Sequence, residues 1–349
     1  MHGIKREELK AIIEGRGCGK NVPMLYDQWI APSVMGYQAE GVRRLLSEVP
    51  CDAAAVEFVW PDMDRAPQDD PDYRWMHRDV ERKKGVGLDS EGCLEWEEAD
   101  AFYAHFPSAD YPGLIPGERP KDDGRYLLGR FWYCFFERLW SLRGMENALT
   151  DFYLYPEEVH RLFRKLTDFY MRAMERGVEE LGIDGIFTSD DIGTQKAPFF
   201  SLEIFREFFK PYYRELCDKA HELVIHFWLH SCGNIELFLE DFIEIGLDVI
   251  HPIQKGTMDE KRIAQKYGDR ICLYVGFDVQ QTIPFGTEEE VRREVRHLID
   301  TYARPDGRFL LTMGNNTTQD WKLSSLEALY DETISYGQKV FRRWQEGKD

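Results

Sequence analysis

The sequence lacks the features of membrane and nucleic-acid-binding proteins. It contains no run of about 18 apolar residues, so we expect no membrane-spanning helix. Lys and Arg total 44 against 63 Asp and Glu, and the formal net charge is -19. Nucleic acids and anionic membrane surfaces are bound by clustered basic residues, so neither is an expected partner. A partner protein with a basic docking face remains compatible with this charge.

A disulfide framework is also absent. The seven cysteines are odd in number and scattered, at positions 18, 51, 93, 134, 217, 232 and 272. This usage suits a reducing compartment. Residues 1–20 are polar and predict an amphipathic helix (Glu7, Leu9, Ile12, Ile13) instead of a secretory signal. We therefore expect a soluble cytoplasmic protein.

The second half of the chain alternates regularly between strand-like and helix-like segments. Apolar runs predict strands over residues 184–189, 223–229, 247–251, 271–276 and 309–313. Helices are predicted between and after them, over residues 201–222, 235–245, 259–266, 288–302 and 324–343. Five strand–helix units in series predict a parallel sheet with helical crossovers.

The first half is less regular. Strands are predicted over residues 22–26 and 53–60, a helix over 37–46, and helical structure again from 140 to 181. Residues 61–123 are rich in acidic residues, Pro, Gly and aromatics, and a stretch this long without periodicity is typical of a functional loop or lid. No repeat or linker divides the chain. The sequence therefore predicts an α/β fold in one domain over residues 1–349, a (β/α)₈ TIM barrel with an N-terminal helical extension and a lid-like insertion.

Polar side chains lie at the carboxyl ends of the predicted strands. They are Glu57, Asp190, Asp191, His230, Cys232, His251, Asp278 and Asn315, with Trp60 beside the first of them. In an α/β barrel the active site lies at the carboxyl ends of the strands. The alternative is that polarity simply resumes where a strand ends. The set of residue types favours a small-molecule site centred on residues 230–234.

His230 and Cys232 are the most specific pair. An imidazole and a thiolate two residues apart can both bind one Zn²⁺ ion, although a catalytic zinc normally takes three protein ligands. The alternative is a buried thiol beside a hydrogen-bonded histidine. Asp190 and Asp191 can likewise bind a metal, steer a cation or transfer a proton, or one of them can cap the following turn.

Seven aromatic residues fall in or near the predicted lid: Trp60, Trp75, Trp96, Tyr103, Phe106, Trp132 and Tyr133. They would suit a small apolar or aromatic substrate and would exclude water from it. They can equally belong to the core.

Several of these segments together resemble the uroporphyrinogen decarboxylase superfamily. The likeness is carried by residues 189–195, 230–235, 244–252 with Gln254, 267–270, Gly276 with Asp278, and 285–291, and it covers residues 120–345 well. The resemblance implies a (β/α)₈ barrel. It also offers two chemistries, namely cofactor-free decarboxylation and cobalamin-dependent methyl transfer.

The residues resemble the methyltransferase branch more closely. True uroporphyrinogen decarboxylases hold their carboxylate-rich substrate with N-terminal arginines, and Asp27 stands where such an arginine is expected. In the methyltransferases zinc is held by a His-x-Cys pair, matched by His230 and Cys232, and by a later cysteine in the last strand. Residues 310–316 contain no cysteine. The third ligand is then Asp191, Glu137 or Cys272, or the metal is absent.

The leading hypothesis is a zinc-assisted methyltransferase of an anaerobic O- or N-demethylation system. Its partners would be a small methyl donor and a corrinoid protein, and a homodimer is among the assemblies we expect. His230 and Cys232 would bind the metal, and Asp190, Asp191 and Glu137 would be catalytic. Glu57, Trp60, His251, Asp278 and Asn315 would bind substrate. The rival hypotheses are a cofactor-free decarboxylase and a barrel that only binds a partner.

Overall fold

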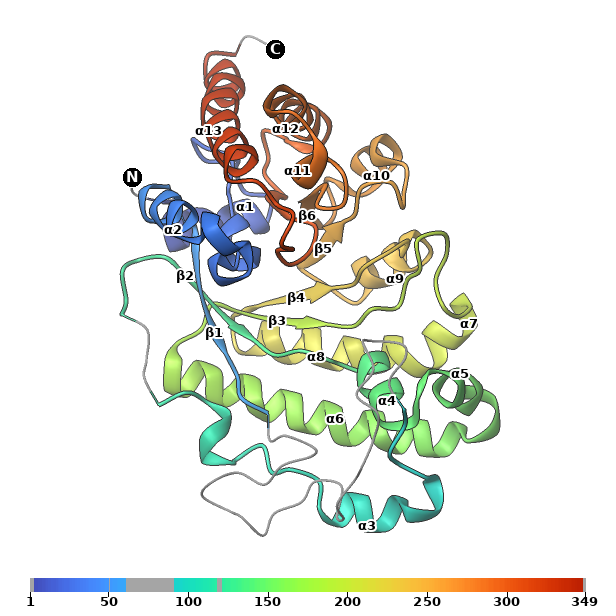
Figure 1. Cartoon of the computed structure of the whole chain (residues 1–349). Coiled ribbons are helices and arrows are strands. Elements are labelled where there is room, and N and C mark those ends of the chain that lie inside the picture. Colours follow the sequence, from blue (N-terminus) through green and yellow to red (C-terminus); the bar gives the residue numbers. More distant parts are fainter. Residues whose placement is uncertain (1–2, 50, 61–90, 118–120, 348–349) are drawn as a thin grey trace.

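The computed structural model describes residues 3–49, 51–60, 91–117 and 121–347 (Figure 1). Within them, seven parallel strands form one sheet in chain order. The strands are β1 (Ala53–Glu57), β2 (Tyr126–Arg130), β3 (Gly185–Ser189), β4 (His226–His230), β5 (Val249–Ile253), β6 (Cys272–Phe277) and β7 (Phe309–Met313). Strands β3 to β7 are buried at every residue, as expected for parallel strands that are covered on both faces.

The sheet curls into a barrel that a single bridged residue helps to close. Met24 pairs with Leu311 of β7 in parallel, and the backbone N–H of Met24 donates to the Asp52 carboxylate, directly before β1, at 2.7 Å. The strand predicted over residues 22–26 is thus wrong in extent, since it shrinks to this one bridge. Pro23 has no N–H to donate, and a 3₁₀ turn, η1 (Tyr26–Trp29), begins at once. The TIM-barrel fold class itself is confirmed.

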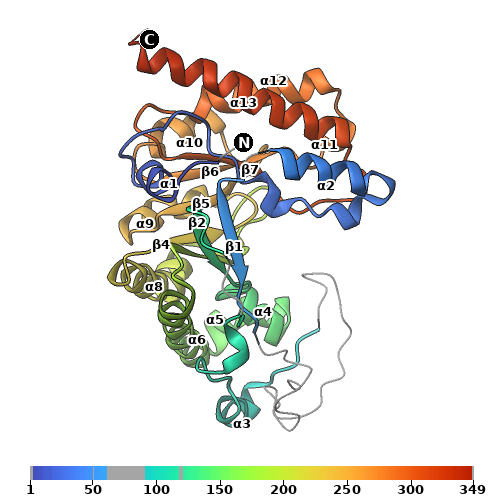
Figure 2. The ribbon, with the colours of Figure 1, turned by 90° about the vertical axis from the view of Figure 1, so that its left-hand side faces the viewer.

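Helices cover the outside of the sheet (Figures 1 and 2). They are α2 (Ala39–Glu48), α4 (Phe136–Arg143), α5 (Met145–Leu154), α6 (Pro156–Arg176), α7 (Leu202–Ile204), α8 (Lys210–Glu222), α9 (Leu239–Glu244), α10 (Glu260–Tyr267), α11 (Thr282–Phe285), α12 (Glu288–Tyr302) and α13 (Leu323–Gln345). A π-helical turn, η7 (Phe205–Phe209), joins α7 to α8, so the helix predicted over residues 201–222 is continuous but irregular.

Aromatic rings fill the barrel interior. Trp228 of β4 contacts Phe187 of β3, with ring centroids 6.1 Å apart, and Tyr274 of β6, at 5.5 Å. Phe187 also reaches Tyr274 at 6.4 Å, although β3 and β6 are not neighbours in the sheet. Because these rings meet across the sheet, the barrel is a packed core and its mouth is left for the site.

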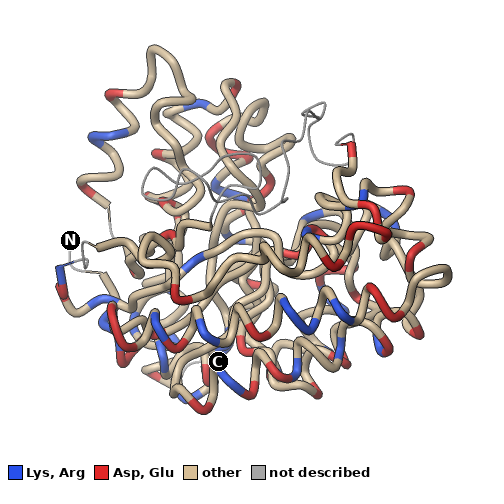
Figure 3. Tube along the Cα trace, turned by 90° about the horizontal axis from the view of Figure 1, so that it is seen from below, with Lys and Arg blue, Asp and Glu red and all other residues tan. Residues whose placement is uncertain are grey.

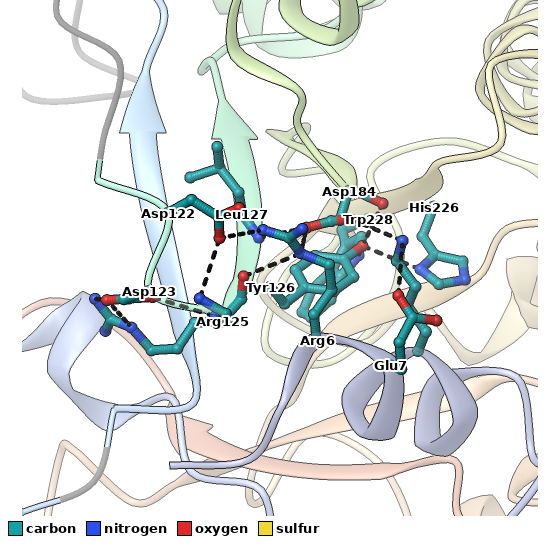
Figure 4. A network of polar contacts seen from close by, with 12 residues as sticks. Arg6, Glu7, Asp122, Asp123, Arg125, Tyr126, Leu127, Asp184, His226 and Trp228 are labelled. Carbon is teal, nitrogen blue, oxygen red and sulfur yellow. Dashed lines mark hydrogen bonds and ion pairs between the residues drawn. The ribbon is translucent and has the colours of Figure 1, made fainter. Parts of the chain in front are cut away.

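The N-terminal helix α1 (Arg6–Ile13) closes the amino end of the barrel, with Leu9, Ile12 and Ile13 buried. Arg6 pairs with the nearly buried carboxylate of Asp184 at 3.0 Å (Figure 4), and Lys10 pairs with it at 2.8 Å. Asp184 also accepts the backbone N–H of Leu127 at 2.8 Å, so one carboxylate ties the helix to β2 and β3. The predicted amphipathic N-terminal helix is confirmed.

The described part of the predicted lid packs on the outside of α5 and α6. Trp96 donates to Asp151 of α5 at 3.0 Å, and Arg176 of α6 donates to the carbonyls of Ala109 and Tyr111, both at 2.7 Å. The described part of the predicted lid includes the helix α3 (Ala99–Ala104). Residues 61–90, with Trp75, lie outside the described residues, so a role of this segment as a lid stays a prediction.

Charge is spread over the surface. Figure 3 shows Asp and Glu alternating with Lys and Arg along the outer helices. None of the helices within the described residues is both long enough and apolar enough to cross a membrane. All seven cysteines are free, as predicted.

Candidate metal centre at the mouth of the barrel

Asp191, His230 and Cys232 come together at the carboxyl ends of β3 and β4. Each offers one ligand atom, and these atoms all lie within 4.8 Å of one another. His230 is the last residue of β4, and Asp191 follows the end of β3 by two residues. Of the carboxylate and thiol candidates for a third ligand, Asp191 is the one that the fold brings to His230 and Cys232.

The two loops that carry these side chains are interlocked. The backbone N–H of Asn234 donates to the Thr194 carbonyl at 2.7 Å, and that of Ile192 donates to the Ser231 hydroxyl at 3.1 Å. A Cβ on Gly233, whose φ is +88°, would lie 2.5 Å from the Thr194 oxygen. The loops can therefore approach this closely only because a glycine stands there. Gln254 secures the same turn by accepting the Gly233 N–H at 2.7 Å.

The spacing of the three side chains suits a metal ion. Nε2 of His230 lies 3.4 Å from the Cys232 sulfur and 3.4 Å from Oδ1 of Asp191. Zinc bonds of about 2.0–2.3 Å in a tetrahedron place neighbouring ligand atoms roughly 3.3–3.6 Å apart. Oδ1 of Asp191 also accepts the backbone N–H of Cys232 at 2.7 Å, which fixes the carboxylate. Imidazole, thiolate and carboxylate are all ligands that zinc accepts.

The electrostatics of the three groups are coupled. Burial disfavours a charged His230, but the Cys232 sulfur and then the Asp191 carboxylate raise the pKa of His230 well above its ordinary value. Burial likewise opposes the charge on Asp191, but the hydrogen bond and charge of His230 lower its pKa. Without a metal, the imidazolium of His230 pairs with the Asp191 carboxylate. A bound cation would take over that function.

His251 contacts His230 from within the core of the barrel. It is fully buried, and its Nδ1 lies 2.7 Å from Nδ1 of His230. Its Nε2 faces the Met313 carbonyl at 3.2 Å, and a carbonyl can only accept, so this nitrogen carries the proton. Burial and the charge of His230 hold the pKa of His251 well below its ordinary value. His251 is therefore neutral and accepts from Nδ1 of His230, which leaves Nε2 of His230 directed at Cys232 and Asp191.

Glu137 lies beside this centre on α4. It is buried and accepts a hydrogen bond from the Ser189 hydroxyl. Burial, followed by the nearby charges of Asp191 and Asp190, raises the pKa of Glu137 to about 8. A carboxyl group at the edge of the site thus holds its proton at neutral pH.

Asp190, by contrast, is fully engaged in holding the fold. It is completely buried and accepts the backbone N–H groups of Phe135 and Glu137, at 3.2 and 2.8 Å, and the hydroxyl of Tyr213. Burial raises the pKa of Asp190 to about 6. These donors lie at the amino end of α4 and on α8, and not in the turn after Asp190 that one interpretation of the sequence has it cap. We therefore assign Asp190 as a positioning residue for Glu137.

Cys272 is separated from the centre by the length of a strand. It is the first residue of β6, whereas His230 is the last residue of β4. Because parallel strands run in the same direction, these two residues lie at opposite ends of the barrel.

The remaining residues that the sequence predicted to bind substrate differ in their contacts. Glu57 lies at the mouth, pairs with Arg130 at 2.6 Å and accepts from Trp132 at 3.1 Å. Trp60 stacks on Phe169 of α6, with centroids 4.1 Å apart. The Asp278 carboxylate accepts the N–H groups of the turn that follows it. Asn315 reaches the Cys232 sulfur.

Trp29, which sequence reasoning missed, forms a wall of the centre. Its ring stacks on His251 at 4.6 Å and lies 5.4 Å from the ring of His230. Trp132 meets Trp29 edge to face at 6.0 Å. Trp29 belongs to the turn that replaces the predicted first strand, so no strand-end pattern marks it.

Comparison with known proteins gives the family. The profile described as Uroporphyrinogen decarboxylase (URO-D) matches residues 138–336, which is more than half of the chain. The chain belongs to the URO-D family. This confirms the resemblance seen in the sequence. No curated protein sequence matches the chain significantly.

A solved structure shows the same fold at low sequence identity, and a second is more distantly similar. A methyltransferase from Methanosarcina mazei superposes with a TM-score of 0.64 at 13% identity, covering 95% of this chain and 98% of the other. A rutinosidase from Aspergillus niger has a TM-score of 0.42 at 11% identity, with 92% and 98% covered. The likeness to the methyltransferase establishes the barrel fold of this URO-D family member and, at 13% identity, nothing more specific.

Proposed function

We propose that this URO-D family protein is a metal-dependent methyltransferase. It would move a methyl group from a small O- or N-methylated molecule to a corrinoid on a partner protein, or from that corrinoid to an acceptor. The observation that carries this proposal is the convergence of Asp191, His230 and Cys232 at the mouth of the barrel. A cofactor-free decarboxylase has no need of an imidazole, a thiol and a carboxylate at zinc-ligand spacing.

In the proposed reaction, the residues near the centre bind the metal, orient one of its ligands or exclude water. His230, Cys232 and Asp191 would hold zinc, which supplies Lewis-acid polarisation of a substrate oxygen or lowers the pKa of a bound thiol or water. His251 orients the imidazole of His230. Trp29 and Trp132 enclose the centre and exclude water from it.

Glu137 would serve as the proton donor. The demethylated oxygen or nitrogen leaves with an additional electron pair and gains a proton. Glu137 carries one at neutral pH, because burial, and then Asp191 and Asp190, raise its pKa to about 8. Its hydrogen bond with Ser189, the last residue of β3, holds the carboxyl group beside the centre.

Metal analysis of the purified protein tests the proposal. We expect about one zinc per chain, because the three ligands form one site. The double variant His230→Ala, Cys232→Ser should lose it, and the matched control Cys18→Ser, with a half-buried thiol outside the site, should keep it. The second measurement is transfer of a labelled methyl group from methyl ethers and methylamines to reduced cobalamin. A metal-free protein with full transferase activity would contradict the proposal.

Decarboxylation is the second candidate, because the family is named for it. Asp27, where an arginine is expected to hold a polycarboxylate, is half-buried and accepts from the Cys51 thiol at 2.8 Å. Burial raises the pKa of Asp27 above its ordinary value. Incubation with uroporphyrinogen decides the matter, since unchanged substrate excludes this candidate.

A further inference from the structure

Asn315 contacts the sulfur of the candidate metal centre from a distant part of the chain. It follows β7, and its Nδ2 lies 3.5 Å from the Cys232 sulfur across 83 residues of sequence. The orientation of the amide is fixed, because its Oδ1 accepts the backbone N–H of Asn316 at 2.7 Å. The NH₂ group therefore faces the sulfur and donates to it.

The sulfur thus has two polar neighbours. His230 Nε2 is at 3.4 Å and Asn315 Nδ2 at 3.5 Å. A side chain that follows the last strand therefore does reach the centre. It brings an N–H donor, which cannot bind a metal, whereas a thiol in its place could. Among the described residues, the His, Cys, Asp and Glu side chains that converge at the centre then offer one sulfur, one nitrogen and one carboxylate oxygen.

We propose that Asn315 is a positioning residue that holds the Cys232 thiolate and keeps the centre to a single sulfur ligand. The inference rests on the proposed function, because it concerns the same centre. An N–H group that donates to a ligating sulfur fixes its direction and reduces the electron density that it gives to a metal. A group of metal ligands with one sulfur is also chemically harder, in the sense of less polarisable, than a group with two sulfurs. Both effects suit the centre to polarising a substrate oxygen, and this points to an oxygen-linked methyl donor.

The first test removes the amide. Asn315→Ala and the similarly sized Asn315→Leu should each weaken zinc binding about 10–100-fold, as loss of an outer partner of a metal ligand does. The matched control is Asn316→Ala, which removes an amide one residue farther along and should leave zinc affinity unchanged. Zinc affinity is measured by competition with a chromophoric chelator.

The second test counts sulfur ligands. In the Co²⁺-loaded protein the sulfur-to-cobalt charge-transfer absorption should correspond to one thiolate in the wild type and rise towards two in Asn315→Cys. Asp191→Ala should lose the metal, and Asp191→Ala combined with Asn315→Cys should regain it, because the new thiol replaces the lost carboxylate.

The outcomes separate this inference from the proposed function. A wild-type chain that binds no zinc and no cobalt overturns both. A wild-type chain that binds zinc, with unchanged affinity in both Asn315→Ala and Asn315→Leu, overturns only the role of Asn315.

Discussion

The Nδ1 atoms of His230 and His251 lie 2.7 Å apart, and this contact decides which nitrogen of His230 faces the centre. His251 is neutral and has given its own N–H to the Met313 carbonyl. It can therefore only accept from His230. His251, which the sequence marks as a candidate substrate residue, is thus in a position to orient the candidate metal ligand His230.

Replacing His251 tests this relationship. His251→Phe retains a ring to stack on Trp29 but cannot accept from His230, so the imidazole of His230 loses its preferred tautomer. We expect zinc affinity to fall about 10–100-fold, as for other outer partners of metal ligands. His251→Gln offers a carbonyl acceptor and should recover part of the affinity. Equal affinities in the wild type and His251→Phe would contradict the assignment.

Removing Asp190 should destabilise the fold. Asp190→Ala leaves the N–H groups of Phe135 and Glu137 and the Tyr213 hydroxyl buried without an acceptor. We expect the free energy of unfolding to fall by about 3 kcal/mol or more, measured by denaturant titration. Tyr213→Phe removes only one of the donors and should cost about 1 kcal/mol. If Asp190→Ala is as stable as Tyr213→Phe, the Asp190 carboxylate does not hold these backbone N–H groups in the way proposed.

Gly233 should tolerate no side chain. In Gly233→Ala the new Cβ would lie 2.5 Å from the Thr194 oxygen, which forces the two ligand-bearing loops apart. We expect loss of bound zinc and a decrease of stability by about 1–3 kcal/mol. Gly256→Ala is the matched control, because Gly256 also has a positive φ, of +78°, but a Cβ there meets nothing within 4 Å. Zinc retention by Gly233→Ala would show that the loops do not need this close approach.

Asp52 should give the stability a measurable pH dependence. This carboxylate receives the N–H groups of Met24 and Ile4, both at 2.7 Å, and burial raises its pKa to about 6. Between about pH 4 and 6 the folded chain therefore holds a proton that the unfolded chain releases. The contribution of Asp52 to the free energy of unfolding is therefore highest near pH 4. It falls as the pH rises towards 6, by about 3 kcal/mol in all.

The measurement compares the wild type with Asp52→Asn. The variant does not titrate at this position, so the difference between their free energies of unfolding should change with pH in this window and level off above it. A constant difference from pH 4 to 7 would show that the pKa of Asp52 is not raised in the folded chain.

Much of the barrel could be predicted from local patterns. The strand at Phe309–Met313 and the helix at Glu288–Tyr302 match their predictions residue for residue. The helix is a long periodic segment and the strand a mostly apolar run, and both have clear ends. The strand β2 was missed, since Tyr126–Arg130 is short and follows a run of charged residues. The strand predicted from residue 223 begins only at His226, because Val224 has a positive φ of 59° that breaks the extended backbone.

The sequence by itself determined the fold class and the chemistry available at the mouth. Strand ends follow from apolar runs, and a parallel barrel must bring all of those ends to one face. The amino-acid order alone was therefore enough to place His230, Cys232 and Asp191 near one another.

Only the tertiary structure decided which of these residues touch, and in what role. The curvature of the sheet and the stagger of its strands bring Asp191 to His230, set His251 behind it and lead Asn315 to the Cys232 sulfur. The same geometry keeps Cys272 at the far end and commits Asp190 to the backbone of α4. Such contacts depend on ångström-scale registers between segments far apart in the chain, and local sequence patterns do not encode them.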